Sequence, residues 1–460
     1  MNSLARSARS VCPVDWLRAF WPKKVRALLL GFAFLGIVAT SPRANAQGLP
    51  ITRDTEIENL LNDYARPIFK TAGLGTSRVA VRIVRNDSLN AFVIDGRNIF
   101  IHTGALLQAQ TPNQVIGIFA QQAGHVAGGH MAALRARIKK DQTQALLKEI
   151  LGIGTTIGAT QKDKTGPVGH SIAKDNEIVM RALAAERRDQ TLAADQAAIR
   201  FLNATQQSGR GMLEVLGAGF TTQGNDEADQ DRISRLRTLA EKSEYSNGKD
   251  APELQLRHDL MRAKLSGYLD RPGVVMNRYP LSDKSLPARY ARALAIYFQG
   301  GQGSFGKALT EVDDLIREKP DNPYFHEVKG DLYMRSGRMK EAIPSLRQAL
   351  KLSPEASLIR VQLATALQKG GGSAEFAESV DLSRKSLIDD QNPRAYRLLA
   401  NAYYKQGKGA DADAMQAQAY FHEGDIKQAK IFAKRAQPKL QQGAPAWMQM
   451  DDIMSHMGGD

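Results

Sequence analysis

The stretch that decides the fold of the front half is FAQQAGHVAGGH, residues 119–130. It lies within a segment from about Thr111 to Lys140 that the sequence predicts to be one helix. Gln121 and His125 are four residues apart, so they lie on the same face of that helix. The predicted helix therefore presents a carboxamide and an imidazole side by side.

This spacing matches the zinc-binding helix pattern H-E-x-x-H, with two of its three functional residues replaced. In that pattern two histidines share the metal and the glutamate activates the metal-bound water. Gln121 stands at the first histidine, Gln122 at the glutamate and His125 at the second histidine. A glutamine side chain neither accepts a proton near neutral pH nor binds zinc as strongly as imidazole. The sequence offers a peptidase helix and argues against peptidase chemistry.

The first 46 of the 460 residues predict an export signal. A basic start precedes an apolar run over 27–40 and the small-residue site Ala44-Asn45-Ala46. The run is short for a membrane span, although an uncleaved anchor remains an alternative. Removing 1–46, which holds 7 Lys and Arg and 1 acidic residue, lowers the net charge from +14 to 55 − 47 = +8 and removes the only cysteine, Cys12.

The mild positive charge that remains suits a periplasmic protein near an anionic membrane or an acidic partner. The sequence has no basic patch interleaved with aromatic residues, so it gives no indication of nucleic-acid binding. With no cysteine after residue 46, the mature chain needs neither disulfides nor a thiol nucleophile. Composition therefore favours an exported globular protein.

Three short β-rich runs precede the helix, over residues 78–84, 90–93 and 98–104. They predict a small meander followed by helices, which is an α+β order. A second helix is expected from about Glu177 to Asn203. The apolar segment 145–159 is interrupted by charges and glycines, which favours a packed helix or a cover over the domain's cleft, with a membrane-touching hairpin as the alternative.

The last third predicts tetratricopeptide repeats. A 34-residue unit starting at Pro323 places small, aromatic and helix-ending residues at the expected positions, namely Gly330, Tyr333, Ala342, Leu346, Ala349 and Pro354. Another unit fits from Arg289, and weaker ones follow to about Ala436. Such helix pairs bury their apolar faces only by stacking, which gives an α-solenoid.

The expected fold is an α+β zincin-like metallopeptidase domain, with a small sheet plus helices, followed by an all-α tetratricopeptide solenoid. The predicted boundaries are a signal over 1–46, the peptidase-like domain over 47–270, the repeats over 271–440 and a C-terminal tail over 441–460.

Together these features resemble the periplasmic β-barrel-assembly-enhancing proteases, a family within the HtpX-type zinc metallopeptidases. The most specific local matches are Asn90-Ala91-Phe92, the turn over 104–107, the pair Gly124-His125, and Ala194-Asp195 on the later helix. The resemblance covers nearly all of the chain after the signal. It implies a zinc endopeptidase scaffold and an envelope role.

The resemblance also locates the other site residues. The resemblance implies that the family's third zinc ligand corresponds to Thr191. The family aspartate persists as Asp195, which is expected to stabilise the first helix through hydrogen bonds without touching the metal. A family histidine loop should lie a few residues before Arg232, where the chain has Asp226-Glu227 instead. Of three ligands only His125 remains, so no cofactor is predicted.

Two histidines outside this pattern are candidate replacement ligands, and neither is expected to serve as one. His102 lies at the end of the strand run and is expected to be a strand-end residue. His130 lies five residues after His125, about 140° around an α-helix, and is therefore expected to point elsewhere.

Three functions compete. The favoured one is a pseudo-peptidase that binds unfolded or outer-membrane polypeptides, with Ile99, Phe100 and Ile101 as an edge strand for the bound chain and the repeats contacting the β-barrel assembly machinery. The first alternative is an active zinc-dependent metalloendopeptidase with atypical ligands. The second is a repeat adaptor whose front domain is a folded spacer.

Overall fold

The computed structural model describes residues 51–75, 79–93, 97–130, 189–219 and 227–456. Within them the peptidase-type helix is α4, Pro112–Ala127. It begins with a capping box, because Thr111 Oγ1 accepts from the Gln114 amide while the Gln114 side chain accepts from the Thr111 amide. It ends earlier than predicted, because Gly129 takes φ +63° and turns the chain away from the helix axis. Residues 1–46, predicted to be an export signal, and residues 145–159 lie outside the described part.

The sheet has four strands in the order β1-β2-β4-β3: β1 Ile51–Thr52, β2 Ala80–Val84, β4 Asn98–His102 and β3 Ala91–Val93. β2 runs parallel to β4, and β3 runs antiparallel to β4. The three predicted strands are present, but the predicted meander is wrong, because β4 inserts between the two strands that precede it in the chain. β1 was not predicted, since two residues carry no alternation to recognise.

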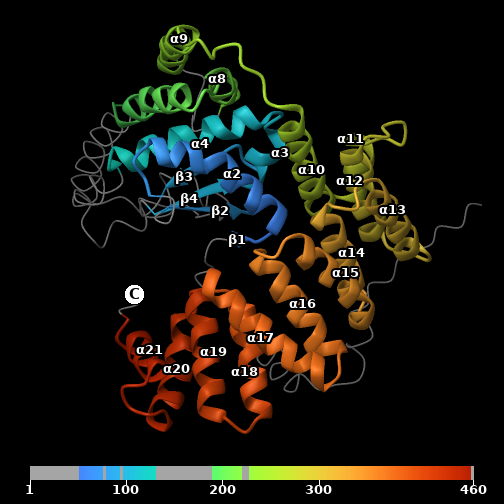
Figure 1. Cartoon of the computed structure of the whole chain (residues 1–460). Coiled ribbons are helices and arrows are strands. Elements are labelled where there is room, and N and C mark those ends of the chain that lie inside the picture. Colours follow the sequence, from blue (N-terminus) through green and yellow to red (C-terminus); the bar gives the residue numbers. More distant parts are fainter. Residues whose placement is uncertain (1–50, 76–78, 94–96, 131–188, 220–226, 457–460) are drawn as a thin grey trace, which may run out of the picture. The chain divides into compact units, whose positions relative to one another are not determined.

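Helices α2, Thr55–Thr71, and α4 pack side by side against this sheet (Figure 1). Their shared core includes an edge-to-face contact of Phe69 with Phe119, with ring centroids 6.5 Å apart. The short helix α3, Thr103–Gln108, follows β4 directly and leads into α4. This layer fixes the position of the α4 face that carries Gln121.

The helix over 189–204 crosses α4 at very close range. A Cβ added to Gly124 would lie 2.5 Å from the carbonyl oxygen of Ala194, so only glycine allows this approach. Helix α8, Arg210–Gly217, packs on α4 as well, and α9, Glu227–Glu241, contacts α8. The described part of the predicted helix 177–203 is therefore present and lies directly against the peptidase-type helix.

From residue 252 onward the described chain is helical. The helices are α10 Pro252–Leu269, α11 Pro272–Arg278, α12 Leu286–Gln299, α13 Ser304–Glu318, α14 Pro323–Arg335, α15 Met339–Leu352, α16 Ser357–Gly370, α17 Ser373–Asp389, α18 Pro393–Lys405, α19 Gly409–Glu423, α20 Ile426–Ala436 with the 3-10 turn Gln437–Lys439, and α21 Pro445–Ser455.

The repeat register predicted from Pro323 is confirmed. α14 begins at Pro323, and Ala342, Leu346 and Ala349 are fully buried in α15. Gly330 is needed because a Cβ there would lie 2.6 Å from the Leu346 side chain. The segment predicted as a C-terminal tail contains α21, which packs on α20. The fold class is therefore confirmed as α+β followed by stacked helix pairs.

A buried charge cluster joins α10 to α2 and α14. Lys264 is 2% exposed, and its Nζ lies 2.8 Å from Asp54 and 3.3 Å from both Glu56 and Glu327. The Tyr290 hydroxyl of α12 donates to Glu56. Three carboxylates around one ammonium leave an excess of negative charge, and burial raises the pKa of Glu327 to about 7. No helix in the described part of the chain has the length and apolar character needed to span a membrane.

Candidate functional site

The predicted site residues of α4 lie against the helix over 189–204. Gln121 Nε2 donates to Asp195 Oδ1 at 3.1 Å, and Gln122 Nε2 donates to Gln121 Oε1 at 2.9 Å. Both glutamines are buried, at 1% and 3% exposure. Gln121 and Asp195, which are 74 residues apart in the sequence, are therefore in direct contact.

Arg232 of α9 completes this group from the other side of the carboxylate. Its Nε donates to Asp195 Oδ2 at 2.6 Å and its Nη2 to Asp195 Oδ1 at 3.1 Å. The Asp195 side chain is fully buried and that of Arg232 is 14% exposed. Burial raises the pKa of Asp195, while the hydrogen bonds from Arg232 and Gln121 act in the opposite direction. A bidentate arginine is the arrangement that keeps such a carboxylate ionised.

The orientation of both amides follows from this carboxylate. An ionised aspartate only accepts, so the Gln121 amide must turn its NH₂ toward Asp195 and its oxygen toward Gln122. Gln122 in turn must present its NH₂ to that oxygen. A continuous chain of donors therefore runs from Gln122 through Gln121 to Asp195, and the Gln121 oxygen already accepts a hydrogen bond.

These residues do not fit a catalytic zinc ion. Such sites use three protein ligands from imidazole, thiolate or carboxylate, with one position open. Here the first position is an amide whose two ends are hydrogen-bonded, and the third position, Thr191, has a hydroxyl group. Thr191 lies one turn before Asp195 and is half-buried. Within the described residues no group of three His, Cys, Asp or Glu side chains is placed to hold a metal.

His130 contacts His125, which corrects the expectation that it points elsewhere. Their Nδ1 atoms are 3.1 Å apart and their ring centroids 5.1 Å apart. The 140° estimate assumed a continuous helix, whereas α4 ends at Ala127 and the turn through Gly129 folds His130 back over the helix end. Burial lowers the pKa of His130.

The predicted edge strand is also corrected. Ile99, Phe100 and Ile101 lie in β4, which is paired on one side with β2 and on the other with β3. Both backbone edges of these residues are therefore occupied within the sheet, and they cannot receive an added strand. β3, one strand further out, lies at the edge of the sheet that the described residues form.

His102 ends β4 in a buried position. Its Nδ1 is 2.6 Å from the Ser88 hydroxyl, its ring stands edge-on to Phe92, and burial lowers its pKa. Its Nε2 has no partner among the described residues. Without an acid on that nitrogen the pair lacks the third group that orients a nucleophile's base.

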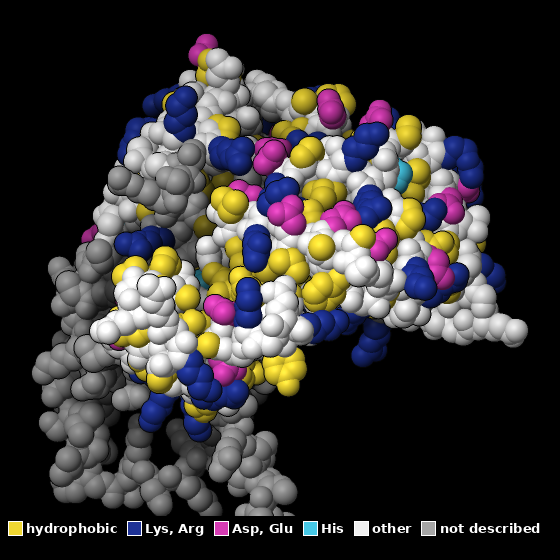
Figure 2. Space-filling model, turned by 60° about the horizontal axis from the view of Figure 1, so that its bottom comes forward, with side chains coloured by type: hydrophobic (Ala, Val, Ile, Leu, Met, Phe, Trp, Pro, Cys, Tyr) yellow, Lys and Arg dark blue, Asp and Glu magenta, His cyan; other side chains and the backbone are white. Residues whose placement is uncertain are grey.

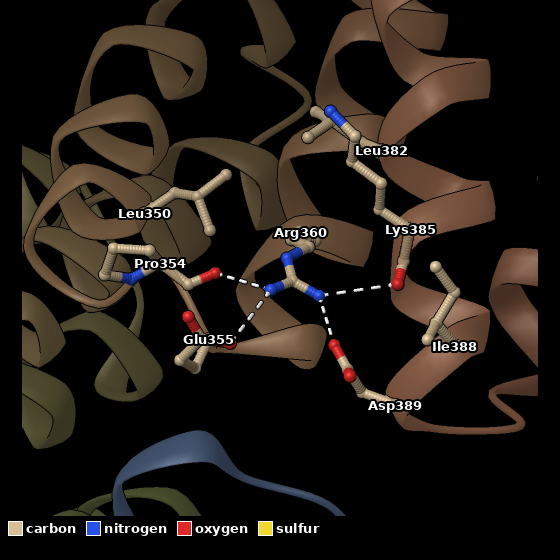
Figure 3. A pocket seen from close by; sticks show the side chains of 8 residues that line it. All are labelled: Leu350, Pro354, Glu355, Arg360, Leu382, Lys385, Ile388 and Asp389. Atoms are coloured by element: carbon tan, nitrogen blue, oxygen red, sulfur yellow. Dashed lines mark hydrogen bonds and ion pairs between the residues drawn. The ribbon is translucent and has the colours of Figure 1, made fainter.

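A recess lies between the repeat helices α15, α16 and α17, with a volume of about 480 Å³ (Figure 3). Arg360 lies across it and donates to the Pro354 carbonyl at 2.6 Å and to the carboxylate of Asp389. Ile388 stands at its rim with 81% exposure. Because the arginine is neutralised from within, this recess offers an apolar rim rather than an anion site.

The sequence pattern predicts no contact for Arg232, which serves there only to locate the missing histidine. That missing histidine position, Asp226, lies outside the described residues, and Glu227 begins α9. The pairing of Arg232 with Asp195 spans 37 residues. The only feature that could have predicted this pairing is Asp195 itself, because a buried aspartate with no partner in its own helix needs a cation from another element.

Comparison with known proteins gives the same two regions. Residues 52–258 match the model of peptidase family M48, and residues 293–357 match a tetratricopeptide-repeat model. Beta-barrel assembly-enhancing protease of Escherichia coli (strain K12) is 22% identical over 432 residues, covering 86% of this chain and 82% of that protein. The same-named protein of Yersinia pestis is 21% identical over 433 residues, with the same coverage.

Solved structures are less similar. MamA (MSR-1) is 18% identical and covers 41% of this chain and 99% of its own, with a TM-score of 0.29. Yeast Tom70 is 11% identical and covers 74% of this chain and 81% of its own, with a TM-score of 0.24. The family assignment rests on the sequence models and on the aligned length of the relatives. Residues 52–258 therefore form a domain of peptidase family M48, and tetratricopeptide repeats follow it in the chain.

Proposed function

We propose that this chain is an exported pseudo-peptidase of the periplasm that binds unfolded polypeptides during assembly or quality control of outer-membrane β-barrel proteins. The named relatives support the assembly role. We infer the lack of proteolysis from the residues of α4 and its neighbouring helices, independently of the relatives.

The observation that carries the proposal is the hydrogen-bonded chain Gln122–Gln121–Asp195–Arg232. At the position where a peptidase of this type needs a general base, Gln122 has a donor NH₂ group engaged with Gln121. Losing a general base alone typically costs about 10²- to 10⁴-fold in rate. The polar groups of these four residues hydrogen-bond to one another, so the scaffold remains stable without a metal.

The proposed edge for polypeptide binding is β3. The amide of His102 donates to the Asn90 carbonyl, and hydrogen-bonded pairs alternate along an antiparallel ladder. The backbone groups of Ala91 and Val93 therefore point away from β4. An extended polypeptide that paired with this edge would add a strand to the sheet and be held without cleavage.

The repeats supply the second contact of the proposal. Figure 2 shows one face on which Lys and Arg side chains are interspersed with hydrophobic and acidic ones, without a continuous basic field. Such a mixed surface favours protein partners over nucleic acid. The exposed Ile388 at the recess of Figure 3 is the apolar anchor proposed for a partner of the β-barrel assembly machinery.

The decisive experiment measures cleavage and binding on the same full-length mature protein. Casein and a urea-denatured outer-membrane β-barrel protein are incubated with it, with and without zinc and chelator, and binding of the β-barrel protein is followed by fluorescence anisotropy. We expect binding without cleavage. Cleavage that is abolished by chelator and by His125→Ala would refute the pseudo-peptidase and establish the active alternative.

Two variants with matched controls locate the contacts. Val93→Pro removes an outward N–H and is expected to weaken polypeptide binding, whereas Val93→Thr keeps it and is expected to bind normally. Ile388→Glu is expected to weaken capture of assembly-machinery components, whereas Leu281→Glu, 72% exposed in the loop between α11 and α12, is not. Unchanged binding in Val93→Pro would support the adaptor, with the front domain as a spacer.

Restoring the family residues tests the register. The triple variant Gln121→His, Gln122→Glu, Thr191→Glu is expected to bind one zinc ion per chain, since Asp195 is already placed to accept a hydrogen bond from the new imidazole. No zinc in a folded triple variant would contradict the alignment of Thr191 with the third ligand.

A further inference from the structure

The end of α4 carries a pair of histidines outside the family's ligand positions. His125 and His130 are both half-buried, with Nδ1 atoms 3.1 Å apart and ring planes at 83°. His130 has no counterpart in the three family positions, which are Gln121, His125 and Thr191. The pair is thus a different arrangement that shares only one residue with the peptidase site.

The backbone builds this arrangement specifically. Gly128 donates its amide to the Gly124 carbonyl at 2.9 Å, and Gly129 donates to the Val126 carbonyl at 3.1 Å. Gly129 has φ +63°, which an L side chain rarely adopts. A Cβ on Gly128 would lie 2.3 Å from His130 Nε2, so the ring occupies space that only a glycine leaves open.

We propose that His125 and His130 form a two-imidazole site for a single divalent transition-metal ion. Metal–nitrogen bonds to imidazole are about 2.0–2.1 Å long, and ligands at about 90–110° to each other then place their nitrogens about 2.9–3.4 Å apart. The separation of 3.1 Å lies within that range. No movement of the backbone is needed to bring the two donors to one ion.

Binding requires a small rearrangement of the two rings. In the hydrogen-bonded pair one Nδ1 carries the proton and points it at the other. That proton must move to Nε2 of the same ring, so that both Nδ1 lone pairs become available, and a neutral pair releases no net proton. Rotation about the soft Cβ–Cγ bonds then brings both lone pairs to the ion.

The chemistry of the site favours Cu²⁺ first and Zn²⁺ or Ni²⁺ next. Imidazole suits all three ions, and affinity for a given nitrogen site rises along the first-row series to Cu²⁺ and falls again at Zn²⁺. Two protein ligands leave the other coordination positions to water or to a donor from a bound polypeptide. The inference does not depend on the proposed function, because a chain without proteolytic activity can hold this ion.

The experiment uses the full-length mature protein without a histidine tag and titrates it with Cu²⁺ against a chromophoric chelator, with electron paramagnetic resonance of the bound ion. We expect one tight Cu²⁺ with a two-nitrogen signature. His125→Ala, His130→Ala and Gly128→Ala should each weaken it about tenfold or more, the loss typical when a metal site is disturbed. Gln121→Ala and His326→Ala, a repeat histidine, should leave it unchanged.

Circular dichroism of each variant shows whether it has folded. No tight Cu²⁺ in the wild type would overturn the proposal, as would affinity that survives His130→Ala. Affinity lost in Gln121→Ala but kept in His130→Ala would assign the ion to the family's ligand positions instead.

Discussion

Arg232→Leu provides a stringent test of the buried network. The substitution removes both charge-assisted hydrogen bonds from a carboxylate that is fully buried. Leaving one member of a buried ion pair alone typically costs about 3–5 kcal/mol. Asp195 can instead take up a proton, and protonating a carboxylate of ordinary pKa about 3.9 at pH 7 costs about 4 kcal/mol. The expected destabilisation at pH 7 is therefore about 3–4 kcal/mol.

The pH dependence of this penalty follows from its cause. In the variant the pKa of Asp195 in the folded state lies further above its value in the unfolded chain, because Arg232 no longer lowers it. The folded state then binds more protons, so its stability rises as the pH falls. Between pH 7 and pH 5 the penalty should shrink by up to about 1.4 kcal/mol per pH unit.

The assay must report on the front domain. The three tryptophans are Trp16, Trp21 and Trp447, so fluorescence follows the first 46 residues and α21 rather than α4. Amide hydrogen exchange of peptides from α4 and from the helix over 189–204 gives local opening free energies instead.

Matched variants isolate the ion pair. Arg235→Leu breaks an exposed pair with Asp231 on the same helix and should cost less than about 1 kcal/mol. The double variant Asp195→Asn, Arg232→Leu should recover much of the loss, since it leaves no buried charge. A cost below about 1 kcal/mol for Arg232→Leu, the same at pH 7 and pH 5, would refute the reasoning.

Three further predictions concern other buried contacts. Gly124→Ala should cost about 1–3 kcal/mol, because its Cβ would meet the Ala194 carbonyl, whereas Gly217→Ala faces open space and should be neutral or mildly stabilising; thermal unfolding compares the two. Lys264→Met should cost about 3–5 kcal/mol by leaving buried carboxylates without their cation, measured by urea unfolding. Burial lowers the pKa of His258 to about 4, so between about pH 6.5 and 4 the folded state binds fewer protons than the unfolded chain. The free energy of unfolding should therefore fall as the pH drops through that window. His258→Gln should flatten this part of the dependence of the unfolding free energy on pH, measured by urea unfolding.

Each of these predictions has a contradicting result. Equal melting temperatures for the two glycine variants would mean that α4 and the helix over 189–204 separate easily. Lys329→Met, which breaks a half-exposed pair with Asp313, serves as the control for Lys264→Met, and equal losses would contradict a special role for burial. A profile that is unchanged by His258→Gln would assign the acid sensitivity to other groups.

Local patterns allowed much of the fold to be predicted. The cap at Thr111 and the strand positions follow from residue preferences within a few positions, and the repeat register follows from several residues recurring at one period. Helix α2 was not predicted, although its N-cap Asp54 and buried face are visible in the sequence once the boundary is known. These successes concern contacts between near neighbours in the chain.

The errors concern contacts between distant residues and special backbone conformations. Strand order depends on which edge the later strand joins, so the pattern of β4 alone did not show that it lies inside the sheet. The pairing of Arg232 with Asp195 has no local periodicity. The contact of His130 with His125 depends on the positive φ of Gly129, whereas the helical spacing predicted the opposite direction. The positions of strands and helices along the chain were therefore easier to predict than the contacts between them.

The cluster around Lys264 limits how far the two halves of the chain can be studied apart. Cutting after residue 270 would keep Lys264, Asp54 and Glu56 but discard Glu327 and Tyr290, so a buried ammonium and two carboxylates would face solvent on a newly exposed surface. A family boundary drawn at residue 258 would separate Lys264 itself from its α2 partners. Keeping the repeats together with the peptidase-type domain therefore keeps this cluster closed, and a chain with exchanged repeats would need Glu327 and Tyr290 to preserve it.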